Sequence, residues 1–243
     1  MFLLLLVISL SSRVLYIIKY PVPVRDSFFY ARVIREWNEN GVIPIETGTP
    51  PLSLYLLGIP NRFLNYDIIK GGICVNLIFG IVFVLLVWHM AYIITCSSIK
   101  SFLVGLLVCI HPELIQFSCN PIRENSYLLF LIGSLYFLTR YIKNDKSIEM
   151  VFGSLLAAAA FMCRLEGLEI ALVYSVIILL VGIKKRCMIK AARDIISFSF
   201  LFVVSLVLIS YSINVPLDYY MYYSRDLSPN RLNISVQPFD PIK

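Results

Sequence analysis

The sequence predicts an all-α membrane protein that crosses the bilayer several times, and three observations lead to this class. Of the 243 residues, 59% are hydrophobic and only 15% are charged, whereas soluble domains are nearer half apolar and a quarter charged. The apolar residues form runs long enough for bilayer-spanning helices. Lys and Arg gather in alternate turns between these runs, as membrane topology requires. The net charge of +6 therefore gives no reason to expect a nucleic-acid partner.

The first apolar run extends from Phe2 to Ile18 and is interrupted only by Arg13. No basic segment precedes it and no small-residue cleavage site follows it, so we expect a retained anchor rather than a signal peptide. The longest polar loop comes next, at residues 19–70. Within it, residues 52–64 are apolar but too few to span a bilayer. We expect this segment to break at Gly58-Ile59-Pro60 and to dip into the membrane interface.

A short surface helix is expected early in this loop, from about Arg25 to Gly41. One apolar stripe recurs at helical spacing: Phe29, Tyr30, Val33, Ile34 and Trp37. The polar side of the helix carries opposite charges four residues apart, Arg32 with Glu36 and Arg35 with Glu39, and such pairs stabilise a helix. Gly41 is suited to end the helix, and Pro44 prevents its continuation. The simplest role for Asp26 is that of the helix N-cap.

Six further spans follow, which makes about seven in all: residues 73–95, 102–117, 124–141, 148–163, 168–183 and 195–213. Pro112 is expected to kink the second of these six. The run Ala157–Ala160 allows close helix contact. Residues 1–213 therefore form one transmembrane domain, and residues 214–243 form a polar tail.

The basic residues predict the orientation of these spans. Three turns are rich in Lys and Arg: the first holds Lys100, the second Arg140, Lys143 and Lys146, and the third the five basic residues from Lys184 to Arg193. The alternate turns hold only Arg123 and Arg164. The richer turns should be cytoplasmic, so the long loop and the tail should lie outside.

The number of spans between polar residues predicts a shared site. Two spans separate Asp26 from Glu124 and two more separate Glu124 from Arg164, and an even number of spans returns the chain to the same side of the membrane. All three residues should face the outer side. There a carboxylate could accept a proton from a hydroxyl group, and arginines could bind a phosphate. The simpler alternatives are that the arginines snorkel at helix ends and that Glu124 is a first-turn acid favoured by the helix dipole.

Other kinds of site find little support in the sequence. Its six cysteines form no CxxC pair and its two histidines lack the spacing of a metal site. We therefore expect no metal and no certain cofactor. Nothing matches a nucleotide-binding loop, which makes a nucleotide sugar a poor substrate candidate.

Three short motifs carry a resemblance to a known family. They are Asp26-x-x-x-Tyr30-Ala31 with Trp37, Gly41 and Pro50-Pro51-Leu52, then Arg123-Glu124, and then the run from Phe161 to Gly167, which contains Arg164-Leu165-Glu166. Their order and spacing resemble the protein mannosyltransferase and aminoarabinose transferase family, membrane glycosyltransferases of the GT-C fold. The resemblance extends over residues 2–180.

This resemblance implies a polyprenyl-phosphate-linked sugar as donor and an extracytoplasmic glycan, lipid or protein as acceptor. It also implies that Asp26 is the general base and that Glu124 is a second catalytic carboxylate. Residues expected to bind substrate are Arg25, Tyr30, Arg32, Arg123, Arg164 and Glu166. The expected location is the bacterial inner membrane, with the active site on its outer face.

The sequence departs from the family in two ways. Arg25 and Ser27 flank Asp26 where many members have an acidic pair, and members are about twice as long. We therefore expect a truncated tail, in a fragment, a split gene product or a degenerate member. Two other functions fit the residues: a carrier or flippase for a lipid-linked or anionic solute, which would need broken helices near mid-membrane, and a non-catalytic scaffold.

Overall fold

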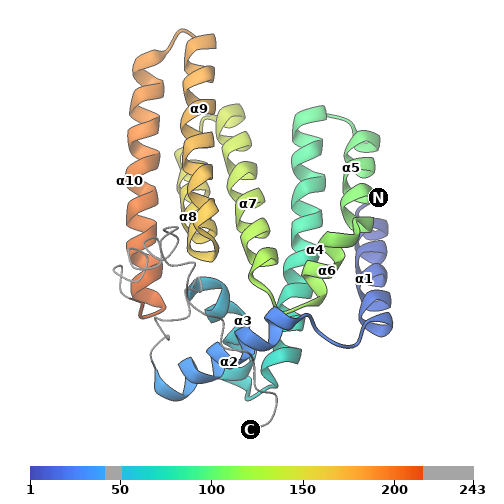
Figure 1. Ribbon diagram of the computed structural model, residues 1–243. Coiled ribbons are helices and arrows are strands. Elements are labelled where there is room, and N and C mark those ends of the chain that lie inside the picture. The colour runs from blue at the N-terminus through green and yellow to red at the C-terminus, as the bar shows by residue number, and fades with distance from the viewer. Residues whose placement is uncertain (42–50, 216–243) are drawn as a thin grey trace, which may run out of the picture.

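The computed structural model describes residues 1–41 and 51–215, and in these residues it is helical and contains no β-strand. Most helices stand side by side as a bundle, while α2 and α3 lie across one end of it (Figure 1). The predicted all-helical class is confirmed. Pro44, Pro50 and the tail from residue 216 onward lie outside the described residues.

Four helices are long and apolar enough to cross a membrane by length and composition. They are α1 (Phe2–Lys19), α4 (Ile68–Thr95), α9 (Leu168–Lys184, preceded by the 3-10 turn Leu165–Gly167) and α10 (Met188–Ser212). A fifth would be the pair α5 (Ser98–Ile110) and α6 (Pro112–Cys119), which bends by 60° at its break. The chain is thus consistent with an integral membrane protein, and the count of about seven stays a prediction.

The two remaining predicted spans are helical but fit a membrane less clearly. α8 (Ser147–Cys163) is apolar and only 17 residues long. α7 (Arg123–Asn144) has 22 residues but carries charges at both ends. These two helices pack closely: Ser134 Oγ on α7 donates a hydrogen bond to the Gly153 carbonyl on α8 at 2.8 Å. Their length and charge are compatible with spans buried inside a bundle.

Several predicted boundaries differ from the observed helices. α4 begins at Ile68, five residues early, because Asp67 caps it by accepting a hydrogen bond from the Lys70 N–H at 2.9 Å. α10 begins seven residues early at Met188, since an apolar run marks the part of a helix inside the membrane rather than the helix ends. The predicted break at Gly58-Ile59-Pro60 is wrong, because α3 (Pro51–Leu64) continues through Pro60.

Burial explains why α3 tolerates its proline. Leu54 and Leu57 are 1% exposed, and Gly58 lies directly against Ile34 of α2. Burying such side chains stabilises the helix by about 1.5 to 3 kcal/mol each. This outweighs the single backbone hydrogen bond that Pro60 cannot donate.

The surface helix α2 (Arg25–Asn40) forms nearly as predicted. It ends at Gly41, whose φ of 71° is left-handed and whose N–H donates to the Trp37 carbonyl at 2.8 Å. Arg32 and Glu36 form the predicted pair at 3.7 Å. Two details were wrong: the N-cap is Val24 rather than Asp26, and Phe29 is 37% exposed and lies against Arg32.

An apolar cluster holds α2 and α3 against the bundle. Tyr30, Val33, Ile34 and Trp37 of α2 pack with leucines of α3, with Met162 at the end of α8 and, at its margin, with Phe117 of α6. The long loop therefore packs on the end of the predicted span 148–163, as expected. Its contact with the span 102–117 is through Phe117, and α3 packs most extensively on α4, which the sequence did not predict. The turns α4–α5, α7–α8 and α9–α10 lie at the opposite end of the bundle (Figure 1).

Candidate active site

A buried asparagine fixes the chain just before α7. Asn76, in the third turn of α4, donates from Nδ2 to the carbonyls of Asn120 at 2.5 Å and Ile122 at 2.9 Å. Asn125 in turn donates to the Asn76 carbonyl at 2.6 Å. Since buried polar groups need partners, these bonds place the first turn of α7 firmly against α4. Arg123 and Glu124 occupy that turn.

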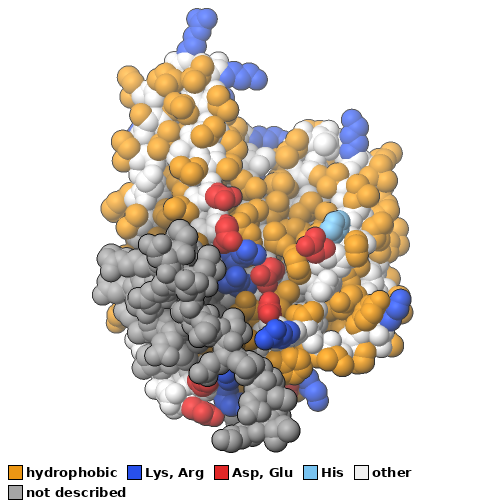
Figure 2. Space-filling view, in the orientation of Figure 1, with side chains coloured by type: hydrophobic (Ala, Val, Ile, Leu, Met, Phe, Trp, Pro, Cys, Tyr) orange, Lys and Arg blue, Asp and Glu red, His pale blue; other side chains and the backbone are white. Residues whose placement is uncertain are grey.

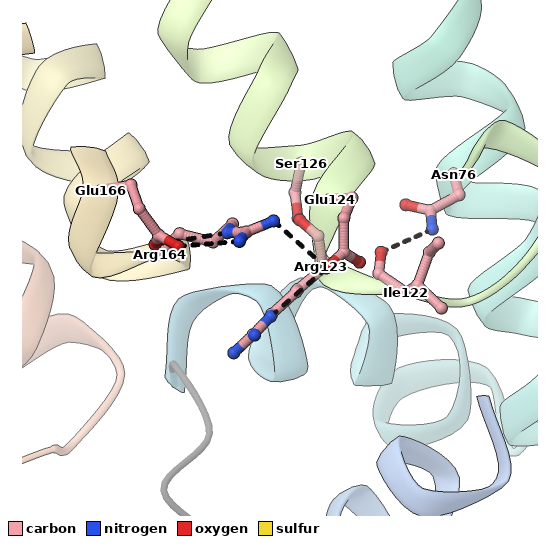
Figure 3. Close-up of polar contacts among 7 residues, drawn as sticks. All are labelled: Asn76, Ile122, Arg123, Glu124, Ser126, Arg164 and Glu166. Atoms are coloured by element: carbon pink, nitrogen blue, oxygen red, sulfur yellow. Dashed lines mark hydrogen bonds and ion pairs between the residues drawn. The ribbon is translucent and has the colours of Figure 1, made fainter. Parts of the chain in front are cut away.

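The turn after α8 brings Arg164 to the same place (Figure 3). Its Nη1 lies 3.4 Å from Glu124 Oε1. The other edge of the guanidinium group binds Glu166, with Nη2 2.8 Å from Oε1 and Nε 3.3 Å from Oε2. Arg123 Nε lies 3.5 Å from the same Glu124 oxygen. Two arginines and two carboxylates from separate parts of the sequence thus form one cluster, which we call the Arg164 cluster.

Gly167 gives this turn its shape. A Cβ at Gly167 would lie 2.3 Å from the Phe161 nitrogen and 2.5 Å from the Ala160 carbonyl carbon, distances that real Cβ atoms do not reach. Only glycine therefore lets Leu165–Gly167 fold back onto the end of α8. The same fold-back presents Arg164 and Glu166 on one side of the turn, which gives the glycine of this motif a physical reason.

The Arg164 cluster is only partly buried. The side chains of Arg164, Glu124 and Glu166 are 26%, 23% and 51% exposed. The Arg164 guanidinium also lies 5.5 Å from the centre of the Tyr127 ring, a favourable cation–π distance. Hydrogen bonding to Glu166 holds the pKa of Arg164 above its ordinary value, so the cation persists at any physiological pH. A phosphate group could reach this cation and compete for it.

The start of α2 is tied to the same region. The Val24 N–H donates to Asn120 Oδ1 at 3.0 Å, and Asn120 stands four residues before Glu124. Asp26, two residues after Val24, is exposed and makes no hydrogen bond or ion pair with the described residues. It therefore does not cap the helix through its side chain there. A hydroxyl-bearing molecule could approach it.

The other predicted substrate-binding residues are on α2. Arg25 and Arg32 are on the exposed face of α2, where Arg32 contacts Glu36 and Phe29 of the same helix. Tyr30 is 6% exposed and packs in the apolar cluster. The roles assigned to these three residues stay predictions. Among residues 1–41 and 51–215, no group of three His, Cys, Asp or Glu side chains could hold a metal ion.

Sequence reasoning missed three residues that build this site: Asn76, Asn120 and Tyr127. A polar amide inside an apolar run is a signal that could have indicated Asn76, because such residues in membrane helices bind other helices. Tyr127 follows Glu124 by one helical turn and could have been found from that spacing.

Acidic and basic side chains gather in one zone of an otherwise largely apolar surface, between the α9–α10 pair and the α4–α5 pair (Figure 2). Comparisons of the chain with protein-family models, with curated proteins and with solved structures find no match.

Proposed function

We propose that the chain is a membrane glycosyltransferase of the GT-C type, which moves a sugar from a polyprenyl-phosphate donor to a hydroxyl group. The observation that carries the proposal is the contact of Arg164 with Glu124. It joins two motifs 40 residues apart, and the bond from Val24 to Asn120 brings the third motif to the same end of the bundle. A carboxylate near paired arginines at a membrane surface suits this chemistry.

In the proposed reaction, Asp26 removes the proton from the acceptor hydroxyl. The acceptor oxygen then bonds to the anomeric carbon of the sugar while the bond from that carbon to the phosphate oxygen breaks. The polyprenyl phosphate leaves with the bonding electrons, and Arg123 and Arg164 stabilise its charge. Glu124 keeps both guanidinium groups in place and assists the acceptor. The proton ends on Asp26 and passes to solvent, because that residue is exposed.

The proposed setting is the bacterial inner membrane, with the Arg164 cluster on its outer face. This orientation rests on the excess of Lys and Arg in the turns at the other end of the bundle. An outward site has access to extracytoplasmic acceptors, namely a glycan, a lipid or a protein. The lipid tail of the donor would lie along the apolar helices.

A carrier for a lipid-linked or anionic solute is a second candidate, favoured by one observation. The α5–α6 break is a real interruption with a 60° bend, and broken membrane helices often form solute sites. Beside it, the Arg13 side chain is fully buried and bonds only neutral groups among the described residues: the Ser9 carbonyl and hydroxyl, and the Gly80 carbonyl at 3.4 Å. A carrier would not need Asp26 as a base.

The deciding experiment compares the wild type with Asp26→Asn in sealed membrane vesicles that hold a polyprenyl-phosphate sugar. Asn keeps the size of the side chain but cannot accept the proton. Transfer to an acceptor should fall by roughly a hundred- to ten-thousandfold, while expression, melting temperature and donor binding stay unchanged. Inverted vesicles should transfer sugar to an added acceptor only after permeabilisation, which tests the orientation.

Glu36→Gln is the matched control, since it removes a carboxylate from the same helix away from the Arg164 cluster. It should retain transfer within about twofold, because exposed pairs such as Arg32–Glu36 contribute little. Equal transfer by the wild type and Asp26→Asn would reject Asp26 as the base. Movement of the sugar lipid across the bilayer without transfer, unaffected by Asp26→Asn, would favour the carrier.

A further inference from the structure

The turn between α9 and α10 forms a basic tip at the end of the bundle away from the Arg164 cluster. Five basic residues lie within ten positions there: Lys184, Lys185, Arg186, Lys190 and Arg193. Lys and Arg side chains project from this end of the α9–α10 pair (Figure 2). Both helices are long and apolar enough to cross a membrane, so the tip lies where a bilayer meets water.

Acidic groups neutralise only part of this charge. Lys190 pairs with Asp145, and Arg193 lies 3.5 Å from Asp194. Among the described residues, Lys184, Lys185 and Arg186 form no ion pair and are exposed. The tip therefore keeps a surplus of positive charge that the fold itself does not use.

Apolar side chains are exposed beside these charges, which distinguishes the tip from an ordinary solvated turn. Ile189 is 90% exposed, Ile183 55% and Met188 48%. A groove of about 860 Å³ runs between the two helix ends, and Ile183, Met188 and Ile189 line it together with Arg186, Lys190 and Arg193. The groove thus combines apolar and cationic side chains.

We propose that this groove binds the headgroup of an anionic phospholipid of the surrounding membrane. The phosphate would contact the cations that line the groove, Arg186, Lys190 and Arg193. The upper part of the acyl chains would cover Ile189 and Met188. A soluble anion would pair with the charges but leave the apolar side chains in water. A neutral lipid would cover the apolar side chains but leave the charges unpaired. An amphiphile with a negative headgroup satisfies both, and basic clusters next to membrane helices attract such lipids.

The test titrates phosphatidylglycerol and phosphatidylcholine into the full-length protein in neutral detergent and counts bound lipids by native mass spectrometry. The wild type should retain phosphatidylglycerol in preference to phosphatidylcholine. The variant Lys184→Gln/Lys185→Gln/Arg186→Gln removes Arg186, which lines the groove, and the two lysines that precede it in the same turn. It breaks no ion pair formed among the described residues. It should bind phosphatidylglycerol more weakly by on the order of fivefold for each charge that contacts the lipid.

The matched control is Lys100→Gln/Lys143→Gln/Lys146→Gln, which removes the same charge from the same end of the bundle but outside the groove. It should bind phosphatidylglycerol within about twofold of the wild type, because none of these three lysines lines the groove. Met188→Ser/Ile189→Ser should weaken the binding of phosphatidylglycerol and leave that of glycerol phosphate unchanged. The melting temperature of each variant reports whether it folds.

Three results would overturn the proposal. The first is an unchanged phosphatidylglycerol affinity in the Lys184→Gln/Lys185→Gln/Arg186→Gln variant. The second is an equal loss in the control, which would show a general effect of charge. The third is glycerol phosphate binding as tightly as phosphatidylglycerol, which would indicate a soluble anion. If the triple variant does not fold, Arg186→Gln, which removes a cation that lines the groove, replaces it, with Lys100→Gln as control.

Discussion

The two ends of the bundle both contain acid–base groups, but they hold them differently. At the end with α2 and α3, Arg164 is shared between Glu124 and Glu166, and all three side chains are partly exposed. At the other end, the Glu149 side chain is 3% exposed. It accepts hydrogen bonds from Arg140 at 2.8 Å and Asn144 at 3.0 Å.

The nearby Asp194 is held in the same enclosed way. It is 6% exposed and accepts a hydrogen bond from the Tyr141 hydroxyl at 2.6 Å. Each of these bonds joins two helices, α7 to α8 through Glu149 and α7 to α10 through Asp194. A buried carboxylate cannot be reached by a substrate, and breaking its pair is costly because a buried charge is then left unpaired. We interpret this end as a structural joint.

The Arg164 cluster has the opposite properties. Its arginine divides its donors between two carboxylates, so an arriving phosphate can replace one of them without leaving a buried charge unpaired. Burial and the sharing of partners, rather than the number of charges, thus separate the candidate site from the structural joint. Each of the following predictions tests this distinction.

The largest difference is expected between Glu124→Gln and Glu149→Gln. Glu149→Gln should lower the free energy of unfolding by about 2 kcal/mol, because hydrogen bonds to a buried charge contribute about 1.5 to 3 kcal/mol. Glu124→Gln should cost less than about 1 kcal/mol of stability but should lower sugar transfer by roughly a hundredfold. Denaturation in detergent and the vesicle transfer assay measure the two quantities. The reverse pattern would exchange the roles of the two ends.

A smaller difference is expected between two glycine variants. Gly167→Ala places a Cβ against the backbone of α8 and should lower the free energy of unfolding by about 1 to 3 kcal/mol. It should also lower sugar transfer, because Arg164 moves. Gly41→Ala meets no atom within 4 Å and should cost only the strain of its positive φ, about 1 to 2 kcal/mol. Its transfer activity per folded molecule should stay unchanged. Equal activities of the two variants would show that the turn does not position Arg164.

Local patterns allowed much of this fold to be predicted from the sequence. The spacing of apolar residues was enough to predict the helix that ends at Gly41. Counting the spans between Glu124, Arg164 and Glu166 was enough to predict that they lie at the same end of the bundle. Features that depend on tertiary packing were missed. Pro60 stays within a helix because the leucines of that helix are buried, and Val24 rather than Asp26 caps α2. The α5–α6 break had a visible signal in Pro112, but its angle depends on how α6 packs against α1 and α4.

The smallest effect is expected at the exposed pair of Asp145 and Lys190, which spans the same turns as the structural joint but lies in water. The Asp145 and Lys190 side chains are 60% and 41% exposed, so the pair should contribute less than about 0.5 kcal/mol. Asp145→Asn is a suitable probe, because Asn tolerates the left-handed φ of 57° found there.

The hydrogen bond from Lys190 lowers the pKa of Asp145, which fixes the sign of the pH dependence. The stabilisation is present above the unfolded-state pKa of about 3.9 and is lost as pH falls through the lower pKa of the folded state. The difference in melting temperature between wild type and Asp145→Asn should therefore stay constant from neutral pH to about pH 4, vanish below it, and shrink in high salt. Because the Glu149 side chain is 3% exposed, the contribution of its pair should respond less to salt. A larger loss of unfolding free energy for Asp145→Asn than for Glu149→Gln would contradict the claim that the buried pair stabilises the fold more than the exposed pair.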